Sequence, residues 1–273
     1  KGVQDRLISP ETIEKKDKSP VTVADYASQA IICSMLADAF PDDVVVGEED
    51  AAELRQDDQA HVRTAVMDQV QAVSDNCVDE QTVLSWIDLG GANADTDAYW
   101  TLDPIDGTTN FLHGIPHFAI SIAVMDKGKI TAGTIFDPAR NEFYFAETGT
   151  GAFLNDRRIR VSGRRKMTDC LFSTGIPFLG RGTAETDTLF LTEMKEIMQA
   201  SSGVRRFGAA ALDLAFVAAG RYDGFWERGL SLWDIAAGYL LVKEAGGFIS
   251  DFSARDNCLV SGEVVAANSA MHI

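Results

Sequence analysis

Hydrophobic positions recur along the chain with two different periods, and these periods predict most of its helices and strands. Between residues 26 and 40 the apolar side chains follow helical spacing, which predicts a helix that Pro41 ends. A second helix is expected at residues 61–73. Short apolar runs separated by glycine-containing turns, such as Lys127-Gly128, predict strands joined as antiparallel hairpins. These strands are expected at residues 44–46, 99–102, 118–126, 130–136, 142–147 and 152–154.

After about residue 163 the pattern changes to strands that alternate with helices. The helices are expected at residues 184–200, 209–219 and 232–245, and the strands at residues 171–174, 204–207, 222–226, 248–250 and 264–267. Antiparallel hairpins followed by alternating units predict an α+β protein with two lobes. We expect residues 1–162 to form the lobe with the antiparallel sheet and residues 163–273 to form the other.

The composition is that of a folded protein with an acidic surface. Hydrophobic residues make up 46% of the 273 residues, and 24 Lys and Arg stand against 41 Asp and Glu, which gives a formal net charge of −17. Because Lys and Arg supply the affinity for phosphate backbones and anionic lipids, this charge argues against binding to a nucleic acid polymer or a membrane surface. An anionic small molecule remains compatible with it if a metal ion or a local dipole offsets the repulsion.

The four cysteines, Cys33, Cys77, Cys170 and Cys258, form no Cys-x-x-Cys pair. In a chain of this size they predict reduced, mostly buried thiols and a cytoplasmic location. The first residues show no signal-peptide pattern. The longest uncharged stretch, residues 107–125, contains Asn, His and Pro and is not expected to span a membrane.

Acidic residues gather at three places where predicted strands end or a helix begins. These places are Glu48-Glu49, Asp103 with Asp106, and Asp234. Carboxylates that lie close together repel one another unless a cation joins them, and hard oxygen ligands of this kind suit Mg²⁺. The sequence therefore predicts a magnesium site if the fold brings the three places together.

The sequence Asp-Pro-Ile-Asp-Gly-Thr-Thr that begins at Asp103 carries the most specific pattern. The proline favours an extended conformation at Asp103, and the turn that follows can bring Asp103 and Asp106 to the same side. The carbonyl oxygen of Ile105 is left to face a metal ion. Gly107 allows a ligand to approach the backbone, and the N–H groups of a helical turn that begins at Thr108 could bind a phosphate.

Each of these patterns also has an explanation that needs no ligand. Asp-Pro-x-Asp-Gly is typical of a surface turn, and a Glu-Glu pair after a strand is typical of a solvated loop. Ser231 and Asp234 match a capping box. Asp25 is placed to cap the helix at 26–40, and Glu227 fits an exposed strand end.

Three motifs, in order along the chain, resemble those of the inositol monophosphatase family. Residues 100–111 (Trp-Thr-Leu-Asp-Pro-Ile-Asp-Gly-Thr-Thr-Asn-Phe) are similar to its first motif. Residues 233–238, followed by Glu-Ala-Gly-Gly at 244–247, are similar to its second. Gly47-Glu48-Glu49 falls where the family has an upstream metal-binding Glu. The resemblance covers nearly the whole chain from Ser19 onward.

Within this family, two parts of the chain resemble different branches. Residues 18–26 and the long acidic insert after Glu49 resemble the 3′(2′),5′-bisphosphate nucleotidases. From Asp106 onward the chain resembles bacterial inositol monophosphatases. We therefore expect a hybrid of the two branches, in effect a chimera.

The resemblance implies a layered α-β-α-β-α sandwich with a site between its two lobes. It implies two or three Mg²⁺ ions, with Li⁺ as an inhibitor. The implied metal ligands are Glu48, Asp103, the Ile105 carbonyl oxygen, Asp106 and Asp234. Thr108 and Asp25 are implied to orient and deprotonate the attacking water, while the N–H groups of Gly107 and Thr108 bind the phosphate.

Substrate contacts are implied in the C-terminal half of the chain, at Gly208, Ala209, Ala210 and Glu227. The family usually carries Thr or Ser at the position of Ala209, so this chain lacks one hydroxyl there. Inositol monophosphatases are typically homodimers and the nucleotidases monomers, and the expectation here is a homodimer.

The expected activity is Mg²⁺-dependent hydrolysis of inositol monophosphate or a similar polyol phosphate, by in-line attack of a metal-activated water. The first alternative is a bisphosphate nucleotidase that releases the 3′-phosphate of 3′-phosphoadenosine 5′-phosphate. Arg205, Arg206 and Arg228 are the candidate cations for the second phosphate of that substrate. A further alternative is a catalytically silent metal-binding protein that acts through interaction partners.

Overall fold

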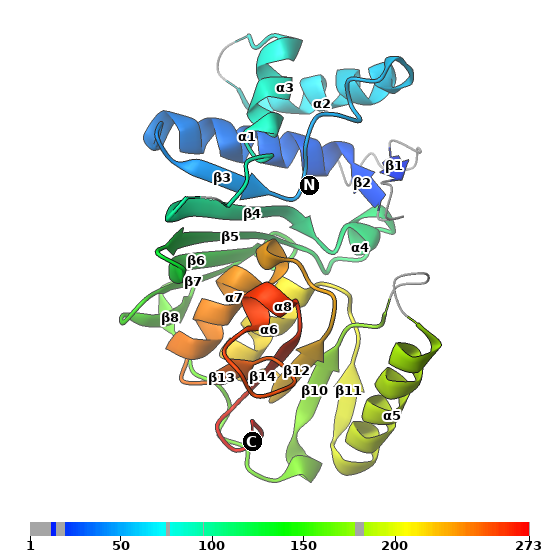
Figure 1. The fold of residues 1–273 in the computed structure, drawn as a ribbon, viewed down its shortest axis with the longest axis vertical. Coiled ribbons are helices and arrows are strands. Elements are labelled where there is room, and N and C mark those ends of the chain that lie inside the picture. Colours follow the sequence, from blue (N-terminus) through cyan, green and yellow to red (C-terminus); the bar gives the residue numbers. More distant parts are fainter. Residues whose placement is uncertain (1–11, 15–19, 75–76, 95, 178–182, 273) are drawn as a thin grey trace.

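The computed structural model describes residues 12–14, 20–74, 77–94, 96–177 and 183–272 (Figure 1), with side chains from residue 21 onward. Lys18 and Ser19, which belong to the segment that resembles the nucleotidases, lie outside the described residues. The helices are α1 (Val23–Ala39), α2 (Ala60–Val73), α3 (Glu80–Asp88), α4 (Thr108–Leu112), α5 (Ala184–Ala200), α6 (Ala210–Ala218), α7 (Leu232–Glu244) and α8 (Cys258–Ser261).

The strands form two large sheets and one small one. The seven-stranded sheet has the order β3 (Val44–Gly47), β4 (Ala98–Asp106), β5 (Ala119–Asp126), β6 (Lys129–Asp137), β7 (Glu142–Glu147), β8 (Gly151–Leu154) and β9 (Arg157–Arg158). The five-stranded sheet has the order β11 (Gly203–Arg205), β10 (Leu171–Thr174), β12 (Gly224–Glu227), β14 (Val264–Ala267) and β13 (Phe248–Ser250). The short strands β1 (Thr12–Glu14) and β2 (Pro20–Thr22) pair with each other.

The elements stack in alternating layers of helices and sheets (Figure 1). Helix α1 covers one face of the seven-stranded sheet, α2 and α3 pack on the other side of α1, and α6 and α7 lie between the two sheets. Helix α5 covers the outer face of the five-stranded sheet. This order of layers confirms the expected α+β sandwich.

Helices α6 and α7 are almost entirely buried because both of their sides face a sheet. They approach each other and the seven-stranded sheet closely at two glycines. A Cβ at Gly238 would lie 2.5 Å from Leu214 Cβ, and a Cβ at Gly133 would lie 2.9 Å from Ala237 Cα. The central layer therefore depends on residues without side chains at these two contacts.

Helix α1 begins earlier than its apolar pattern indicates. Thr22, not Asp25, is the N-cap, and its side chain accepts hydrogen bonds from the N–H groups of Ala24 and Asp25. Asp25 is the N3 residue of a capping box, and its carboxylate accepts the Thr22 N–H at 2.8 Å. The prediction that Asp25 caps the helix was therefore wrong in position, although Asp25 does take part in capping.

Strand β4 continues through the acidic motif, which was expected to form a turn after residue 102. Pairing with β5 aligns Asp103 with Ser121 and Asp106 with Ala119, so three steps on β4 match two on β5. Such a bulge adds one residue to a strand and changes the alternation of its side chains. Both carboxylates are consequently buried on one side of the strand, and the surface-turn explanation does not hold.

The acidic segment between β3 and β4 contains one helix that the pattern did not predict, α3. Its N-cap, Asp79, accepts a hydrogen bond from the N–H group of Thr82, and three of its residues are buried against α1 and α2.

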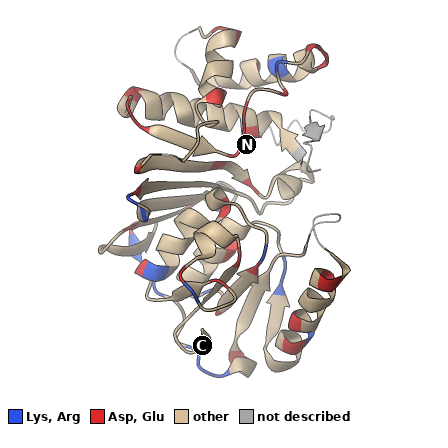
Figure 2. Cartoon of the chain, in the orientation of Figure 1, with Lys and Arg blue, Asp and Glu red and all other residues tan. Residues whose placement is uncertain are grey.

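Asp and Glu are spread over the N-terminal helices and α5 (Figure 2). Cys33, Cys170 and Cys258 are buried free thiols, whereas Cys77 is exposed. No helix in the described part of the chain combines the length and apolar character that a membrane crossing requires.

Candidate functional site

Three of the predicted acidic residues converge from segments far apart in the sequence. Asp103 and Asp106 lie in β4, and Asp234 lies in the first turn of α7. One carboxylate oxygen from each lies within 4.8 Å of the other two. Asp103 and Asp106 are buried and Asp234 is half-buried, so the fold holds three acids in one small, largely enclosed volume.

A backbone N–H group fixes each of these three carboxylates. Asp103 Oδ1 accepts the N–H of Ile105 at 2.9 Å. Asp106 Oδ2 accepts the N–H of Ala211 at 2.7 Å, in the first turn of α6. Asp234 Oδ2 accepts the N–H of Ser231 at 2.7 Å, which forms the predicted capping box. Capping therefore does not compete with a role in the cluster, because the same carboxylate does both.

Burial and the charges of neighbouring acids raise the pKa values of Asp103 and Asp106. The pKa of Asp106 is raised to about 8, first by burial and then by the charge of Asp234. The pKa of Asp103 is raised well above its usual value by burial and by the charges of Glu48 and Asp106. Glu48 lies outside the group within 4.8 Å, yet its charge acts on both buried acids.

This donor set fits a divalent cation such as Mg²⁺. The three side chains offer only hard oxygen atoms, and the charges that raise the pKa values of Asp103 and Asp106 are those of neighbouring acids. A bound cation would favour the charged form of all three carboxylates and remove the cause of the repulsion. The expectation that Ile105 supplies its carbonyl oxygen stays a prediction.

Thr108 and Asp25 lie next to each other although 83 residues separate them in the chain. Thr108 Oγ1 lies 3.3 Å from Asp25 Oδ1 and 3.0 Å from the carbonyl oxygen of Ile105. Because a hydroxyl has one proton, it can donate to only one of these acceptors at a time. Asp25 is fully buried and its other oxygen is held by Thr22. The pair therefore has the geometry to hold a polar molecule beside the acidic cluster.

Gly107 connects β4 to α4 in a conformation that favours glycine, with φ of 90°. A Cβ there would lie 3.1 Å from the carbonyl oxygen of His117 and 3.2 Å from Ala209 Cβ. The loop before α6 therefore packs directly on the start of α4. This contact places Gly208 and Ala209 beside Gly107, and their role as substrate contacts stays a prediction.

Two amide side chains that the sequence did not single out hold the loops of this site. Asn110 Nδ2 donates to the carbonyl oxygens of His117 and Phe207, at 2.8 and 2.6 Å. Gln29 is fully buried and bonds to both the N–H and the carbonyl group of Glu49. Asn110 lies within the motif at 100–111, but nothing local to Gln29 marks it, because its partners are 20 residues or more away.

Glu227 is half-buried at the end of β12 rather than exposed. Its pKa is raised to about 8, mainly by burial and then by the charges of Asp234 and Asp106. Its carboxylate therefore faces the acidic cluster closely enough to be affected by it. Of the three candidate cations, Arg228 is occupied by Glu193, with two contacts of 2.7 Å, and stacks on Phe252.

A buried acid that the sequence did not single out, Asp213, lies near Glu227. Asp213 of α6 is buried close to Ser173 of β10, and its two carboxylate oxygens make no hydrogen bond of good geometry with the described residues. The pKa of Asp213 is raised well above its usual value by burial and by the charges of Glu227 and Asp106. Only the packing of α6 against β10 and β12 reveals this residue.

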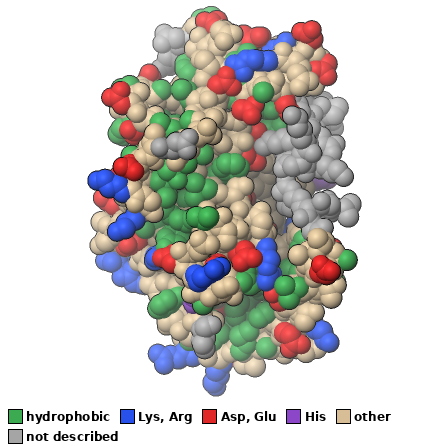
Figure 3. Space-filling view, viewed as in Figure 1, with side chains coloured by type: hydrophobic (Ala, Val, Ile, Leu, Met, Phe, Trp, Pro, Cys, Tyr) green, Lys and Arg blue, Asp and Glu red, His purple; other side chains and the backbone are tan. Residues whose placement is uncertain are grey.

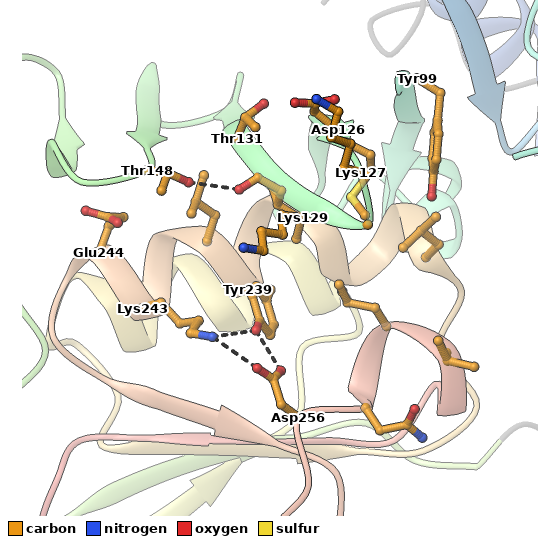
Figure 4. Close-up of a pocket in the computed structure, with 18 residues that line it drawn as sticks. Tyr99, Asp126, Lys127, Lys129, Thr131, Thr148, Tyr239, Lys243, Glu244 and Asp256 are labelled. Carbon is orange, nitrogen blue, oxygen red and sulfur yellow. Dashed lines mark hydrogen bonds and ion pairs between the residues drawn. The ribbon is translucent and has the colours of Figure 1, made fainter. Parts of the chain in front are cut away.

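A separate cavity of about 1110 Å³ lies on the outer side of α7, between that helix, the β5–β6 hairpin and α8 (Figure 4). It shares no residue with the predicted site. Tyr239 Oη donates to Asp256 at 2.6 Å, and Lys243 Nζ lies 3.3 Å from the other oxygen of Asp256. Hydrophobic side chains gather across the middle of this face (Figure 3), and Val260 of α8 is 86% exposed.

Comparison with known proteins identifies the family. The profile of the inositol monophosphatase family matches residues 3–273. An inositol-1-monophosphatase of Mesorhizobium japonicum is 56% identical over 177 residues, which are 65% of this chain and 65% of that protein. The match thus spans slightly less than two thirds of that relative. The Nus factor SuhB of Pseudomonas aeruginosa is 40% identical over 94% of this chain and 81% of its own length.

Solved structures agree with this result. The extragenic suppressor protein SuhB of Bartonella henselae is 38% identical, has a TM-score of 0.79 and covers 99% of this chain, with 88% of its own chain covered. An inositol monophosphatase of Anabaena (Nostoc) sp. PCC 7120 is 32% identical, with a TM-score of 0.73 over 92% of this chain and 84% of its own. The motifs, the order of the layers and these relatives together show that the chain belongs to the inositol monophosphatase family.

Proposed function

We propose that this protein is a Mg²⁺-dependent phosphomonoesterase that hydrolyses inositol monophosphate or a similar polyol phosphate. The observation that carries the proposal is the convergence of Asp103, Asp106 and Asp234 within 4.8 Å. Family membership supports it, because relatives of this chain include proteins named inositol-1-monophosphatase. That the N-terminal third derives from a nucleotidase-like branch stays a prediction.

In this proposal Asp103, Asp106 and Asp234 hold Mg²⁺, with Glu48 and the Ile105 carbonyl oxygen as further ligands. Bound Mg²⁺ supplies Lewis-acid chemistry, which activates water and stabilises the charge of the leaving oxygen. The acids must be ionised to bind it, so the raised pKa of Asp106 makes cation binding compete with protons.

Thr108 and Asp25 orient the attacking water and take its proton. The hydroxyl of Thr108 accepts a hydrogen bond from water while donating to Asp25, 3.3 Å away. Asp25 is kept in place by Thr22 and is the terminal acceptor of the proton. The N–H groups of Gly107 and Thr108 at the start of α4 bind the phosphate.

The C-terminal half binds the alcohol part of the substrate. Glu227 hydrogen-bonds to hydroxyl groups, and the backbone of Gly208, Ala209 and Ala210 lines the site. Ala209 offers no hydroxyl, so Glu227 carries more of the recognition than in relatives with Thr or Ser there. Because Arg228 is paired with Glu193, it is a poor partner for a second phosphate.

The test is a comparison of phosphate release from inositol 1-phosphate and from 3′-phosphoadenosine 5′-phosphate, with Mg²⁺ and with EDTA. We expect Mg²⁺-dependent release, faster from inositol 1-phosphate, and inhibition by Li⁺. Faster turnover of the nucleotide would reverse the substrate assignment. Absence of release from both would leave the silent metal-binding protein as the better explanation. Light scattering would test the expected homodimer.

A further inference from the structure

Gly175 lies at the end of β10, directly beside Glu227. Strands β10 and β12 are parallel, and their register pairs Thr174 with Trp226. The next residues along the two strands, Gly175 and Glu227, are therefore level with each other. Side chains at level positions of neighbouring strands point to the same face of a sheet and come into contact.

The carboxylate of Glu227 occupies the space that a side chain at position 175 would fill. A Cβ built on Gly175 would lie 1.7 Å from Glu227 Oε1, 1.9 Å from Cδ and 2.3 Å from Oε2. These distances are far inside van der Waals contact, so no other residue type allows Glu227 to keep this position. The backbone of Gly175 needs no glycine for its own conformation, because its φ is outside the left-handed region.

The ends of the two strands are held together. Thr174 Oγ1 donates to the carbonyl oxygen of Trp226 at 2.7 Å, which ties the end of β10 to β12. Both Thr174 and Gly175 are buried. A side chain at position 175 would therefore displace the flexible end of Glu227 rather than the sheet.

In this position the carboxylate of Glu227 faces the charged residues of the site. The charges that act on Glu227 are those of Asp234 and Asp106, which raise its pKa, and of Arg206, which lowers it. Folded back over Gly175, the carboxylate is held on the side of the acidic cluster. A ligand whose phosphate lies at the cluster would therefore be on the same side as this carboxylate.

We propose that Gly175 determines substrate specificity, because its missing side chain gives Glu227 the place from which it hydrogen-bonds to the hydroxyl groups of a polyol phosphate. Gly175 is thus a positioning residue that acts through Glu227. This inference rests on the proposed function, since it assigns Glu227 to the substrate.

A double-mutant cycle on inositol 1-phosphate and phenyl phosphate, which lacks the polyol, tests the inference. The variants are Gly175→Ala, Glu227→Ala and the combination of the two. We expect Gly175→Ala to raise KM for inositol 1-phosphate about tenfold, the loss of one hydrogen bond to a charged group, and to lower the preference over phenyl phosphate by the same factor. In the Glu227→Ala background the same substitution should change neither value, because the displaced carboxylate is gone.

The matched control is Gly163→Ala, since a Cβ there meets nothing within 4 Å. We expect it to behave as the unmodified protein. Thermal unfolding of Gly175→Ala should stay within a few degrees of the unmodified protein, because only a side-chain end is displaced. Equal losses from Gly175→Ala with and without Glu227 would overturn the inference and leave the proposed function intact. If the unmodified protein hydrolyses neither ester, the proposed function fails and the inference fails with it.

Discussion

Asp106 is held in the site by a hydrogen bond although neighbouring acids repel its charge. Its carboxylate accepts the N–H of Ala211 at 2.7 Å, and its pKa is nevertheless raised to about 8. The hydrogen bond to the helix start lowers the pKa, but burial and the charge of Asp234 outweigh it. The residue is therefore poised between a proton and a cation.

Asp106→Asn should separate these two roles. The amide keeps an oxygen for the Ala211 N–H but offers no charge to a cation, so we expect phosphate release to fall at least about 100-fold. The metal-free variant should unfold at a higher temperature than the metal-free unmodified protein, because the folded variant neither has to bind a proton at this position nor has to bury a charge there. Activity with Mg²⁺ and unfolding temperature in EDTA are the two measurements.

The control for this substitution is Asp256→Asn, an acid that bonds to Tyr239 outside the site. We expect its activity to stay within about twofold of the unmodified protein, as is usual for an exposed polar change. Full activity of Asp106→Asn would contradict the assignment of Asp106 as a ligand.

Thr108→Val should test the proton path at the level of one hydroxyl. Valine has nearly the same shape but cannot bond to Asp25, so we expect kcat to fall about 100-fold or more with little change in KM. Thr108→Ser keeps the hydroxyl and should retain most of the activity. Equal kcat values for the two variants would show that the hydroxyl has no part in the reaction.

At the scale of elements, α7 contributes to the site and to the core at once. Its first turn carries Asp234, and its middle packs on α6 at Gly238, where a Cβ would lie 2.5 Å from Leu214 Cβ. A shift of α7 to relieve crowding there would therefore also move Asp234 relative to β4.

Gly238→Ala should destabilise the protein for this reason. Alanine favours a helix over glycine by about 1 kcal/mol, but overpacking a core costs about 1–3 kcal/mol, so we expect a net loss of about 1 kcal/mol. Denaturant unfolding measures it, with Gly163→Ala as the open-space comparison. If Gly238→Ala raised the free energy of unfolding, α6 and α7 would have to move apart without losing stability, which would contradict this prediction.

At the scale of the whole molecule, the acidic site makes stability depend on pH. Asp106 and Glu227 each have a pKa of about 8 in the folded protein, raised from values near 4. Between these limits the folded protein binds more protons than the unfolded chain does. The free energy of unfolding of the metal-free protein must therefore fall as pH rises from about 4 to about 8.

Mg²⁺ should reverse this trend, because it binds the ionised acids of the folded state. We expect the unfolding temperature in EDTA to be lower at about pH 8.5 than at about pH 6, and the increase caused by Mg²⁺ to be larger at the higher pH. Differential scanning fluorimetry at the two pH values measures both. If the increase in unfolding temperature caused by Mg²⁺ did not depend on pH, the cation would not bind at the acids whose pKa values are raised.

The elements that the sequence predicted are those held together by interactions between residues close together in the chain. The capping box of Ser231 and Asp234, the long helix after Thr22 and the hairpin at Lys127-Gly128 were predicted because their interactions join residues a few positions apart. The placement of Asp103 and Asp106 on the same side was predicted for the same reason. Helix α3 was missed because it is only nine residues long and lies in an acidic segment, although its buried residues Val83, Leu84 and Ile87 follow helical spacing.

Only the tertiary structure decided which of these local pieces meet. The extension of β4 through the acidic motif depends on pairing with β5, and the contact of Asp25 with Thr108 spans 83 residues. The glycine that gives Glu227 its place lies 52 residues before it, on a neighbouring strand. Composition and spacing therefore determined the kind of chemistry this chain carries. Its geometry was set by the packing of two sheets around α6 and α7, because contacts between distant residues follow from the path of the chain and leave no periodic trace in the sequence.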